Sequence, residues 1–365
     1  MKSKKAIDIF KKVVSEEIKS IIYKEISVSK EREKLGLLRK MFRNVFPLRI
    51  KKTFHYFLEC REKNAPHFVS LNEKKLSLDF LDYVLRKDPE IPYIYFPPSD
   101  WQEIDKFIKN KFLIAIFDEL DQDQIFDNQD LKRQKFYNIS LKNYPIGKKR
   151  GYYEFLGYKS IVNHFDAHIF IGEYGLNYFK DKKKLIDSTI VDCGAFIGDS
   201  VYLFNQKLNP KKIIAIEPDY INYNKLLSNI HLNGMKNVIP LLKGVGEKKG
   251  FFNIVHNGGS TYLSEYKARD KTEVDTIDNL VKELKLENIG LVKMDIEGFE
   301  LPAIRGAQET IKKFRPALII SLYHRGQDFF KIPKFIKELV PQYQFRFINL
   351  NEGCPIYERL LVAEY

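Results

Sequence analysis

The stretch TIVDCGAFIGDS at residues 189–200 begins as an apolar run and ends in a turn rich in glycine. The positions that close the run, form the turn and open the next segment are Asp192, Gly194, Ala195, Gly198, Asp199 and Ser200. Glycines at such a turn let the backbone come close to a ligand and let the next helix pack tightly. The stretch therefore predicts a strand, a ligand-binding turn and a helix, in that order.

Strand-length apolar runs alternate with helical segments from about residue 186 to the C-terminus. After the first run they are KKIIAIEPD, NVIPLLKG, GLVKMDIEG, ALIISLYH, QFRFINL and RLLVAEY. Continuous apolar strands with helices between them indicate a mostly parallel sheet that is covered on both faces. We therefore predict a doubly wound α/β domain, in which ligands bind beyond the carboxyl ends of the strands.

The glycine turn departs from the dinucleotide-binding fingerprint GxGxxG. Phe196 stands two residues after the first glycine, where that fingerprint has its second glycine. Asp199 adds a carboxylate at the expected helix start, which would repel a pyrophosphate. An NAD-dependent oxidoreductase is therefore disfavoured, whereas a cationic or zwitterionic ligand is not.

The second apolar run ends at Glu217, which is followed by Pro218. A carboxylate about 20 residues beyond the glycine turn can accept hydrogen bonds from ribose hydroxyls. An isolated glycine turn is often only a turn. Combined with Glu217 in strand, loop, helix, strand order, it predicts a ligand that carries a nucleoside.

The fourth run, VKMDIEGFE, places three carboxylates and an amine at the exit of a central strand: Lys293, Asp295, Glu297 and Glu300. The next run leads to His324 at the same edge of the sheet. Buried charge is unfavourable unless it is paired or functional. Asp295 and Glu297 either cap the following helix or face a reaction centre, and these two roles can coexist.

Length and composition limit the class of protein. With 365 residues and 44% hydrophobic content, the chain is too apolar to be disordered and long enough for two domains. The three cysteines, Cys60, Cys193 and Cys354, are far apart, which excludes a CxxC metal site and argues against a disulfide framework. Neither a signal peptide nor a membrane span is expected from the pattern. The expected location is the cytoplasm.

The formal charge of +13 is concentrated near the N-terminus, because residues 1–63 hold 18 Lys and Arg against 8 Asp and Glu. Apolar residues at spacings of three and four predict an amphipathic helix in this segment. The helix either packs on its own domain or docks on an anionic surface, such as the inner face of a membrane. We predict a basic, mainly helical domain of unassigned role at residues 1–150 and a catalytic domain at residues 151–365.

Five segments of the second half of the chain have a specific order and spacing. They are VDCGAFIGDS, AIEPD, VDTIDNLV, VKMDIEGFELPAIRGA and RPALIISLYH. Through them, residues 165–365 resemble the FkbM-type family of S-adenosylmethionine-dependent methyltransferases. The resemblance implies a class I methyltransferase (Rossmann-like) fold, with a seven-stranded sheet that ends in an antiparallel hairpin. It also implies methyl transfer to oxygen, usually a hydroxyl of a sugar or another natural product. The N-terminal extension lies outside the resemblance.

S-adenosylmethionine is the cofactor that the resemblance implies. Its methionine part would be lined by Asp192, Gly194, Ala195 and Gly198, and Glu217 would hold its ribose. Asp192 and Asp199 can lie close to its positive charge, and which of them contacts the ammonium stays open. Further cofactor-binding residues are expected at Ser200, Pro218, Gly244 and Val245, the last two beside the adenine ring.

Methyl transfer to a hydroxyl requires an aligned acceptor and a base for its proton. We predict Asp295 or His324 as the base and Glu297 as the residue that orients the base or the acceptor. No metal site is predicted, because a recognisable ligand set is lacking, although a divalent ion on Asp295, Glu297 and an acceptor diol stays open. The loop NGGSTYLSE at residues 257–265 is either a flap over the acceptor or an ordinary hairpin turn.

The expected acceptor is a sugar or glycan, such as a surface polysaccharide or a lipid-linked oligosaccharide. The alternative is a nucleic-acid methyltransferase that grips phosphates with the basic N-terminus. A base-amine methyltransferase would be expected to carry an aromatic-bearing proline pair after the fourth strand, and MDIEGFE has none. Nucleic acid is therefore not the expected partner, and the oligomeric state is not predicted.

Overall fold

The computed structural model describes residues 5–13, 15–16, 67–117, 119–264, 269–351 and 353–365. The chain divides into two compact units. One comprises Met1–Ile91 and Ile104–Asn128, and the other comprises Pro92–Glu103 and Gln129–Tyr365. Residue 150, the expected boundary of the catalytic domain, lies within the second unit, and that functional division stays a prediction. Most of the basic segment 1–63 lies outside the described residues.

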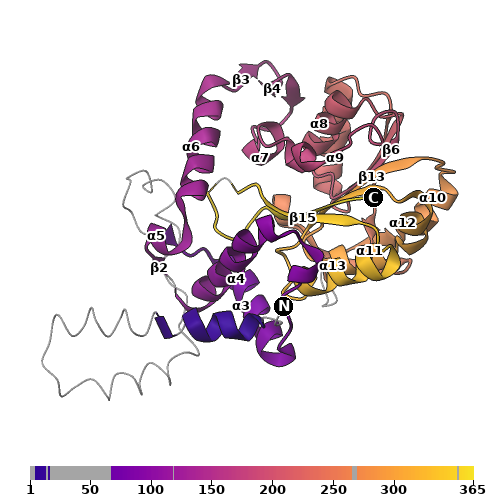
Figure 1. The fold of residues 1–365 in the computed structure, drawn as a ribbon. Helices are drawn as coiled ribbons and strands as arrows, with labels where there is room; N and C mark the ends of the chain where they lie inside the picture. Colours follow the sequence, from indigo (N-terminus) through magenta and orange to yellow (C-terminus); the bar gives the residue numbers. More distant parts are fainter. Residues whose placement is uncertain (1–4, 14, 17–66, 118, 265–268, 352) are drawn as a thin grey trace, which may run out of the picture. The chain divides into compact units, whose positions relative to one another are not determined.

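The described part of the first unit is mainly helical, as its sequence predicts (Figure 1). Its elements are the helical residues 6–13, β1 (His67–Phe68), α3 (Leu71–Lys87), most of α4 (Trp101–Ile116), β2 (Glu119–Leu120) and α5 (Gln122–Ile125). Helix α3 begins at a capping box, in which Ser70 Oγ accepts from the Glu73 amide and the Glu73 carboxylate accepts from the Ser70 amide. The rings of Phe80, Phe107 and Phe112 pack edge to face in the core of this unit.

Seven strands of the second unit form one sheet in the order β15, β16, β14, β13, β6, β7, β8. Their bounds are β6 (Thr189–Cys193), β7 (Lys212–Ile216), β8 (Val238–Leu241), β13 (Ile289–Met294), β14 (Ala317–Ser321), β15 (Gln344–Asn349) and β16 (Arg359–Glu364). The five strands from β14 to β8 are parallel, and β16 runs antiparallel to both β14 and β15. This arrangement confirms the predicted doubly wound sheet with a terminal antiparallel hairpin.

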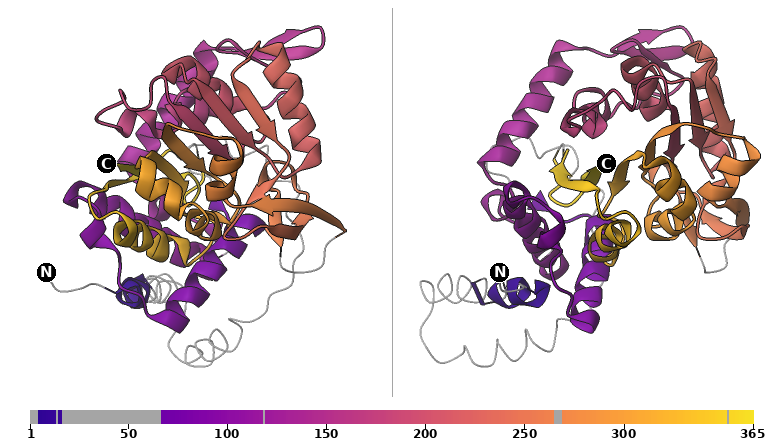
Figure 2. Two further views of the ribbon diagram at one scale, coloured as in Figure 1. Left: turned by 90° about the vertical axis from the view of Figure 1, so that its right-hand side faces the viewer. Right: turned by 45° about the vertical axis from the view of Figure 1, so that its right-hand side comes forward.

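Helices cover both faces of this sheet, which explains why its central strands are apolar from end to end. Helices α8 (Asp199–Leu208) and α9 (Tyr220–Leu232) lie on one side (Figure 2). The other side carries α10 (Ile277–Glu283), α11 (Glu300–Arg305), α12 (Gln308–Phe314) and α13 (Asp328–Leu339). All residues of β6 and β13 are buried between these layers. The unit also contains α6 (Asn128–Asn143), α7 (Ala167–Phe170) and the 3-10 segments Tyr93–Tyr95, Pro98–Asp100 and Glu173–Tyr178.

Two smaller sheets lie outside the main one. The first has the order β3 (Gly147–Lys149), β4 (Tyr152–Phe155), β5 (Tyr158–Ser160), and the second has the order β11 (Tyr262–Ser264), β10 (Gly250–Val255), β12 (Asp270–Asp275), β9 (Gly244–Val245). Strands β10 and β11 are antiparallel neighbours. The described part of the loop NGGSTYLSE, residues 257–264, is therefore the turn and second strand of a hairpin.

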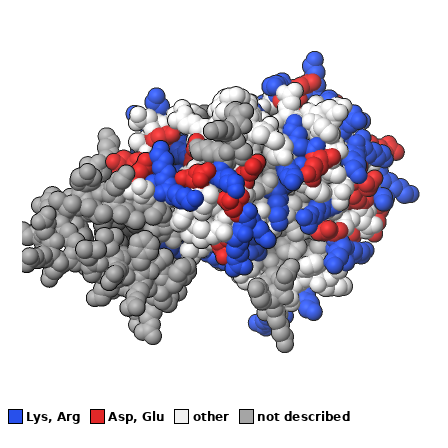
Figure 3. Space-filling view, turned by 60° about the horizontal axis from the view of Figure 1, so that its bottom comes forward, with Lys and Arg blue, Asp and Glu red and all other residues white. Residues whose placement is uncertain are grey.

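Charged side chains on the described residues are mixed in sign. On the face drawn in Figure 3, Lys and Arg are interspersed with Asp and Glu. This is the distribution expected if the basic surplus belongs to the N-terminal segment. Within the described part of the chain, the helices are all too short or too polar to cross a membrane.

Candidate functional site

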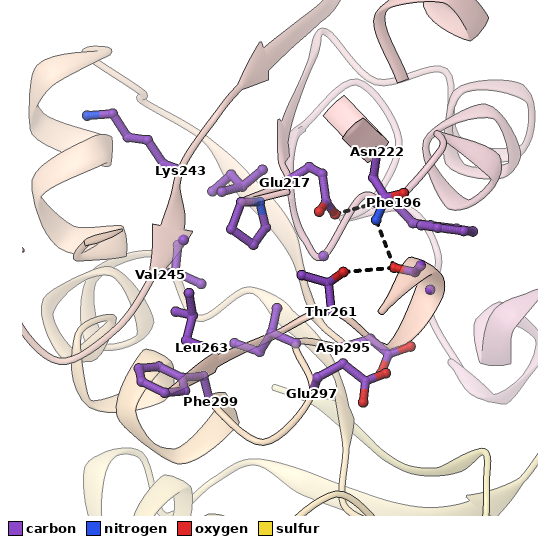
Figure 4. Close-up of a pocket in the computed structure, with 17 residues that line it drawn as sticks. Phe196, Glu217, Asn222, Lys243, Val245, Thr261, Leu263, Asp295, Glu297 and Phe299 are labelled. Carbon is purple, nitrogen blue, oxygen red and sulfur yellow. Dashed lines mark hydrogen bonds between the residues drawn. The ribbon is translucent and has the colours of Figure 1, made fainter. Parts of the chain in front are cut away.

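The carboxyl ends of β6, β7 and β13, which are adjacent in the sheet, border an open pocket (Figure 4). The predicted site residues that line it are Gly194, Glu217, Pro218, Gly244, Val245, Asp295 and Glu297. The other predicted site residues are buried and do not line it: Asp192, Ala195, Gly198, Asp199, Ser200 and His324. A pocket at this edge lies where folds of this kind bind their ligands, beyond the carboxyl ends of the strands.

Glu217 follows β7 and is held in one orientation by the backbone. Its Oε2 accepts a hydrogen bond from the Phe196 amide at 2.9 Å, and its Oε1 accepts one from the Asp219 amide at 2.9 Å. Each carboxylate oxygen keeps a further lone pair for a ligand hydroxyl. Burial raises the pKa of Glu217 to about 7, although both amide donors act to lower it.

Apolar side chains form another wall of the pocket. Val245, Leu263 and Phe299 stand together on one side of it in Figure 4. Val245 comes from β9, Leu263 from β11, and Phe299 precedes α11. Such a wall is suited to the face of a planar aromatic ring.

The β10–β11 hairpin is tied to the start of α9, so the hairpin is a fixed part of the pocket wall. Thr261 Oγ1 donates to Asp219 Oδ2 at 2.8 Å, and Asn222 Nδ2 donates to the Gly258 carbonyl at 2.8 Å. His256 Nδ1 lies 2.8 Å from the same Asp219 oxygen. Of the two alternatives that the sequence offered, the structure shows the hairpin turn, and a flap over the acceptor stays a prediction.

Gly194 brings the turn after β6 against the turn after β13. Its φ of 81° is in the left-handed region, and a Cβ at this position would lie 1.9 Å from the Asp295 carbonyl oxygen. Any side chain would therefore force these two turns apart. The glycine is required by the close packing of two strand exits, and it leaves its own backbone exposed to the pocket.

Asp192 is paired inside the protein. Its Oδ2 accepts from Ser200 Oγ at 2.7 Å, and its Oδ1 lies 3.1 Å from Lys293 Nζ. Lys293 also donates to the Gly194 carbonyl at 2.7 Å. Burial acts to lower the pKa of Lys293, but the carboxylates of Asp192 and Asp295 outweigh it and the pKa is raised. Lys293 therefore stays protonated, and its contacts with Asp192 and the Gly194 carbonyl fix the turn after β6.

Asp199, by contrast, keeps an oxygen without a partner. Its Oδ1 accepts from the Ser200 amide at 2.8 Å, whereas its Oδ2 has no hydrogen-bond partner among the described residues. Burial, reinforced by the nearby carboxylate of Asp166, raises the pKa of Asp199 to about 6. A cation placed beside this oxygen would stabilise the ionised form.

Asp295 follows β13 and reaches the pocket with both oxygens oriented. Oδ2 accepts from the Tyr174 hydroxyl at 2.7 Å, and Oδ1 accepts from Ser321 Oγ at 2.8 Å. Burial acts to raise the pKa of Asp295, but Lys293, His324 and the two hydroxyl donors overcome it, and the pKa lies below its usual value. Asp295 is thus a carboxylate at neutral pH.

His324 lies behind Asp295 and Glu297, with a side chain that is only 2% exposed. Its Nδ1 is 2.8 Å from Glu300 Oε1, and its Nε2 is 3.4 Å from Glu297 Oε2 and 3.7 Å from Asp295 Oδ1. Burial acts to lower the pKa of His324, but the carboxylates of Glu297 and Glu300 raise it well above its usual range. The structure thus brings the three predicted catalytic residues together.

Sequence reasoning missed Tyr174, Ser321, Thr261 and Phe299 as neighbours of the site. Tyr174 lies in a 3-10 segment that precedes the sheet, and its φ of 45° gave no recognisable sequence signal. Ser321 is the last residue of β14, so inspection of every strand end could have found it. Thr261 belongs to a hairpin whose docking on α9 depends on tertiary contacts.

Residues 192–347 match the family model described as the methyltransferase FkbM domain. The hexuronic acid methyltransferase AglP of Haloferax volcanii is 25% identical to this chain over 178 residues, which cover 47% of this chain and 71% of AglP.

Two solved structures are similar at low sequence identity. The methyltransferase FkbM from Methylobacillus flagellatus KT aligns with a TM-score of 0.45 and 19% identity, over 79% of this chain and 58% of that one. A putative methyltransferase from Streptococcus mutans in complex with SAH aligns with a TM-score of 0.35 and 15% identity, over 55% of this chain and 99% of that one. This chain therefore spans little more than half of the M. flagellatus protein.

Proposed function

We propose that the chain transfers the methyl group of S-adenosylmethionine to a hydroxyl of a sugar or glycan. The match of residues 192–347 to the methyltransferase FkbM domain supports this proposal. The observation that carries this proposal is the pocket at the strand exits, where the buried carboxylate of Glu217 lies beside an apolar wall. A nucleoside needs both features, one for its ribose and one for its base.

The cofactor can be placed from these contacts. Glu217 accepts hydrogen bonds from the ribose hydroxyls, and the adenine ring packs against Val245, Leu263 and Phe299. The methionine part runs along the turn that contains Gly194. We assign its ammonium to Asp199 in preference to Asp192. Each has one oxygen without a hydrogen-bond partner among the described residues, but that oxygen of Asp192 lies 3.1 Å from Lys293 Nζ.

The acceptor is proposed from chemistry and from one relative. AglP is a hexuronic acid methyltransferase, and a hexuronic acid is a sugar that offers both hydroxyl and carboxylate oxygens as acceptors. The side chains of Asp295 and Glu297 both line the pocket (Figure 4), where they can accept hydrogen bonds from acceptor hydroxyls.

Asp295 is the proposed base. As the acceptor oxygen forms a bond to the methyl carbon, the carbon–sulfur bond breaks, its electron pair stays on sulfur, and the hydroxyl proton passes to the carboxylate. Tyr174 and Ser321 hold that carboxylate in place, and Glu297 orients the acceptor. His324 does not line the pocket and acts as a positioning residue.

The experiment that tests this function supplies S-adenosylmethionine with a labelled methyl group together with a glycan that contains hexuronic acid, a neutral glycan or an RNA. We expect a methyl ether on a sugar, detected by mass spectrometry. Asp295→Asn should lower the rate by about 10²–10⁴-fold, the usual contribution of a general base, while the cofactor still binds. The exposed Asp181→Asn is the matched control. Labelling of RNA alone, or an unimpaired Asp295→Asn, would contradict the assignment.

We also propose a cytoplasmic location with peripheral contact to the inner membrane face through residues 1–63, where lipid-linked glycans would be accessible. The support is charge alone, since 18 Lys and Arg stand against 8 Asp and Glu in this segment. A basic segment of this kind is attracted to anionic lipid. The segment lies mostly outside the described residues.

A further inference from the structure

One imidazole is surrounded by three carboxylates at the end of the pocket. Asp295, Glu300 and His324 each offer an atom that can bind a metal, and these atoms all lie within 4.8 Å of one another. Glu297 adds a third carboxylate, with Oε2 3.4 Å from His324 Nε2. Capping of α11 does not account for this cluster, because the N-cap residue is Phe299 and it makes no side-chain capping bond.

Glu300 has a complete set of partners. Its Oε1 accepts from the Ile296 amide and its Oε2 accepts from the Gly298 amide, both at 2.9 Å, and Oε1 also contacts His324 Nδ1. The carboxylate thereby fixes the orientation of the ring and favours a proton on Nδ1. This is the arrangement by which a carboxylate prepares a histidine to bind a metal through its other nitrogen.

The other ring nitrogen provides an independent observation. Nε2 of His324 is buried and has no hydrogen-bond partner among the described residues. It points between Asp295 Oδ1 at 3.7 Å and Glu297 Oε2 at 3.4 Å. A buried polar atom without a hydrogen-bond partner calls for an explanation, and a bound ion is one of those known.

We propose that a divalent cation binds between His324 Nε2, Asp295 Oδ1 and Glu297 Oε2, with Glu300 orienting the imidazole. Mixed imidazole and carboxylate ligands suit a first-row ion such as Mn²⁺. Binding through Nε2 releases the proton that the surrounding carboxylates otherwise keep on this nitrogen. Two of the three ligands, Asp295 and Glu297, line the pocket, so the remaining coordination positions face it.

The cation also restricts which acceptors can bind well, a consequence that rests on the proposed methyl transfer. An ion with free positions can bind two neighbouring oxygens, such as a vicinal diol or a hydroxyl beside a carboxylate. Coordination lowers the pKa of a bound hydroxyl, so a weakly basic carboxylate is sufficient to take its proton. An acceptor that lacks the second oxygen should be methylated without stimulation by the ion.

Electron paramagnetic resonance with Mn²⁺ and the full-length protein tests the site directly. We expect one bound Mn²⁺ per chain, and an affinity at least about tenfold lower in Glu297→Gln and in His324→Gln, the scale seen when metal-site partners are removed. Glu297 lies on the pocket wall, so its variant keeps the test valid if His324→Gln disturbs the fold. The exposed His231→Gln is the control and should bind normally. Mn²⁺ that stays free, or binds both variants like the wild type, would overturn the site.

Cofactor binding by the same samples separates this inference from the proposed function. Binding of S-adenosylmethionine without Mn²⁺ binding overturns the cation site alone. Mn²⁺ binding that both variants weaken, without any cofactor binding, supports the site and overturns the methyl-transfer proposal. In turnover assays, Mn²⁺ should stimulate methylation of an acceptor diol and leave its deoxy analogue unaffected, and equal stimulation of the two would contradict the chelation.

Discussion

At Glu217, burial and hydrogen bonding act in opposite directions on a single carboxyl group. Burial favours the neutral acid, and the two backbone amides favour the carboxylate, with the result that its pKa is about 7. Ribose hydroxyls would add donors and stabilise the charged form further. The pKa of this side chain therefore lies close to neutral pH, so that ligand binding can shift it to the charged form.

The first prediction concerns the pH dependence of cofactor affinity. The pKa of Glu217 is raised, so its carboxylate is lost as pH falls through about 7. If the carboxylate form binds the ribose, affinity should fall by up to about tenfold per pH unit below that value. Calorimetric titration with S-adenosylmethionine between pH 6 and pH 8 measures this. Glu217→Gln should remove this pH dependence, and an unchanged profile in the variant would exclude Glu217 as the titrating group.

Among the elements, β6 and β13 deserve comparison because their exits meet at one point. They are parallel neighbours in which Lys293 lies opposite Asp192, and the turns that follow them approach each other at Gly194. A buried ion pair and a glycine contact thus fix the relative position of two strand ends that carry the proposed cofactor and acceptor sites.

Gly194→Ala should destabilise the protein by about 2–4 kcal/mol, because it combines a left-handed backbone with a steric clash against the Asp295 carbonyl. The control is Gly234→Ala, where φ is +61° and nothing lies within 4 Å of the added Cβ. The control shares the backbone strain and lacks the clash, so its loss should be about 1 kcal/mol. Thermal denaturation of both variants gives the comparison, and equal losses would mean that the two turns can separate freely.

Lys293→Met should cost about 3–5 kcal/mol, because it leaves the buried carboxylate of Asp192 without its counter-charge. Adding Asp192→Asn to that variant should recover part of the loss. Chemical denaturation of the two single variants and the double variant yields the coupling free energy. Additive losses would show that the two side chains do not depend on each other.

At the scale of the whole molecule, the fold could be predicted from apolar runs that are bounded by glycines and acids, because strands that are buried on both faces are apolar along their whole length. Inspection of the strand ends also led to Glu217 and Asp295, which line the pocket, and to His324, which lies beside Asp295. Tyr174 and Thr261 could not be predicted, since they reach the site from a 3-10 segment and a hairpin whose positions depend on tertiary contacts. That His324 Nε2 has no hydrogen-bond partner among the described residues is likewise visible only in three dimensions.

The charge of the whole chain leads to a prediction about membranes. With a net charge of +13 that is concentrated in residues 1–63, the full-length protein should sediment with vesicles that contain anionic phospholipid and not with neutral ones. Raising the salt concentration should release it, because exposed charges are screened. Equal sedimentation with both vesicle types would contradict an electrostatic contact.

The central claim is that the pocket beside Glu217 holds S-adenosylmethionine. Calorimetric titration with S-adenosylmethionine, S-adenosylhomocysteine and NAD, on the wild type, Glu217→Gln and the exposed control Glu287→Gln, tests it most directly. We predict that the first two ligands bind and NAD does not, with affinity about 10–100-fold lower in Glu217→Gln, as expected for lost hydrogen bonds to a charged group. Binding of NAD, or unaltered cofactor affinity in Glu217→Gln, would contradict the account.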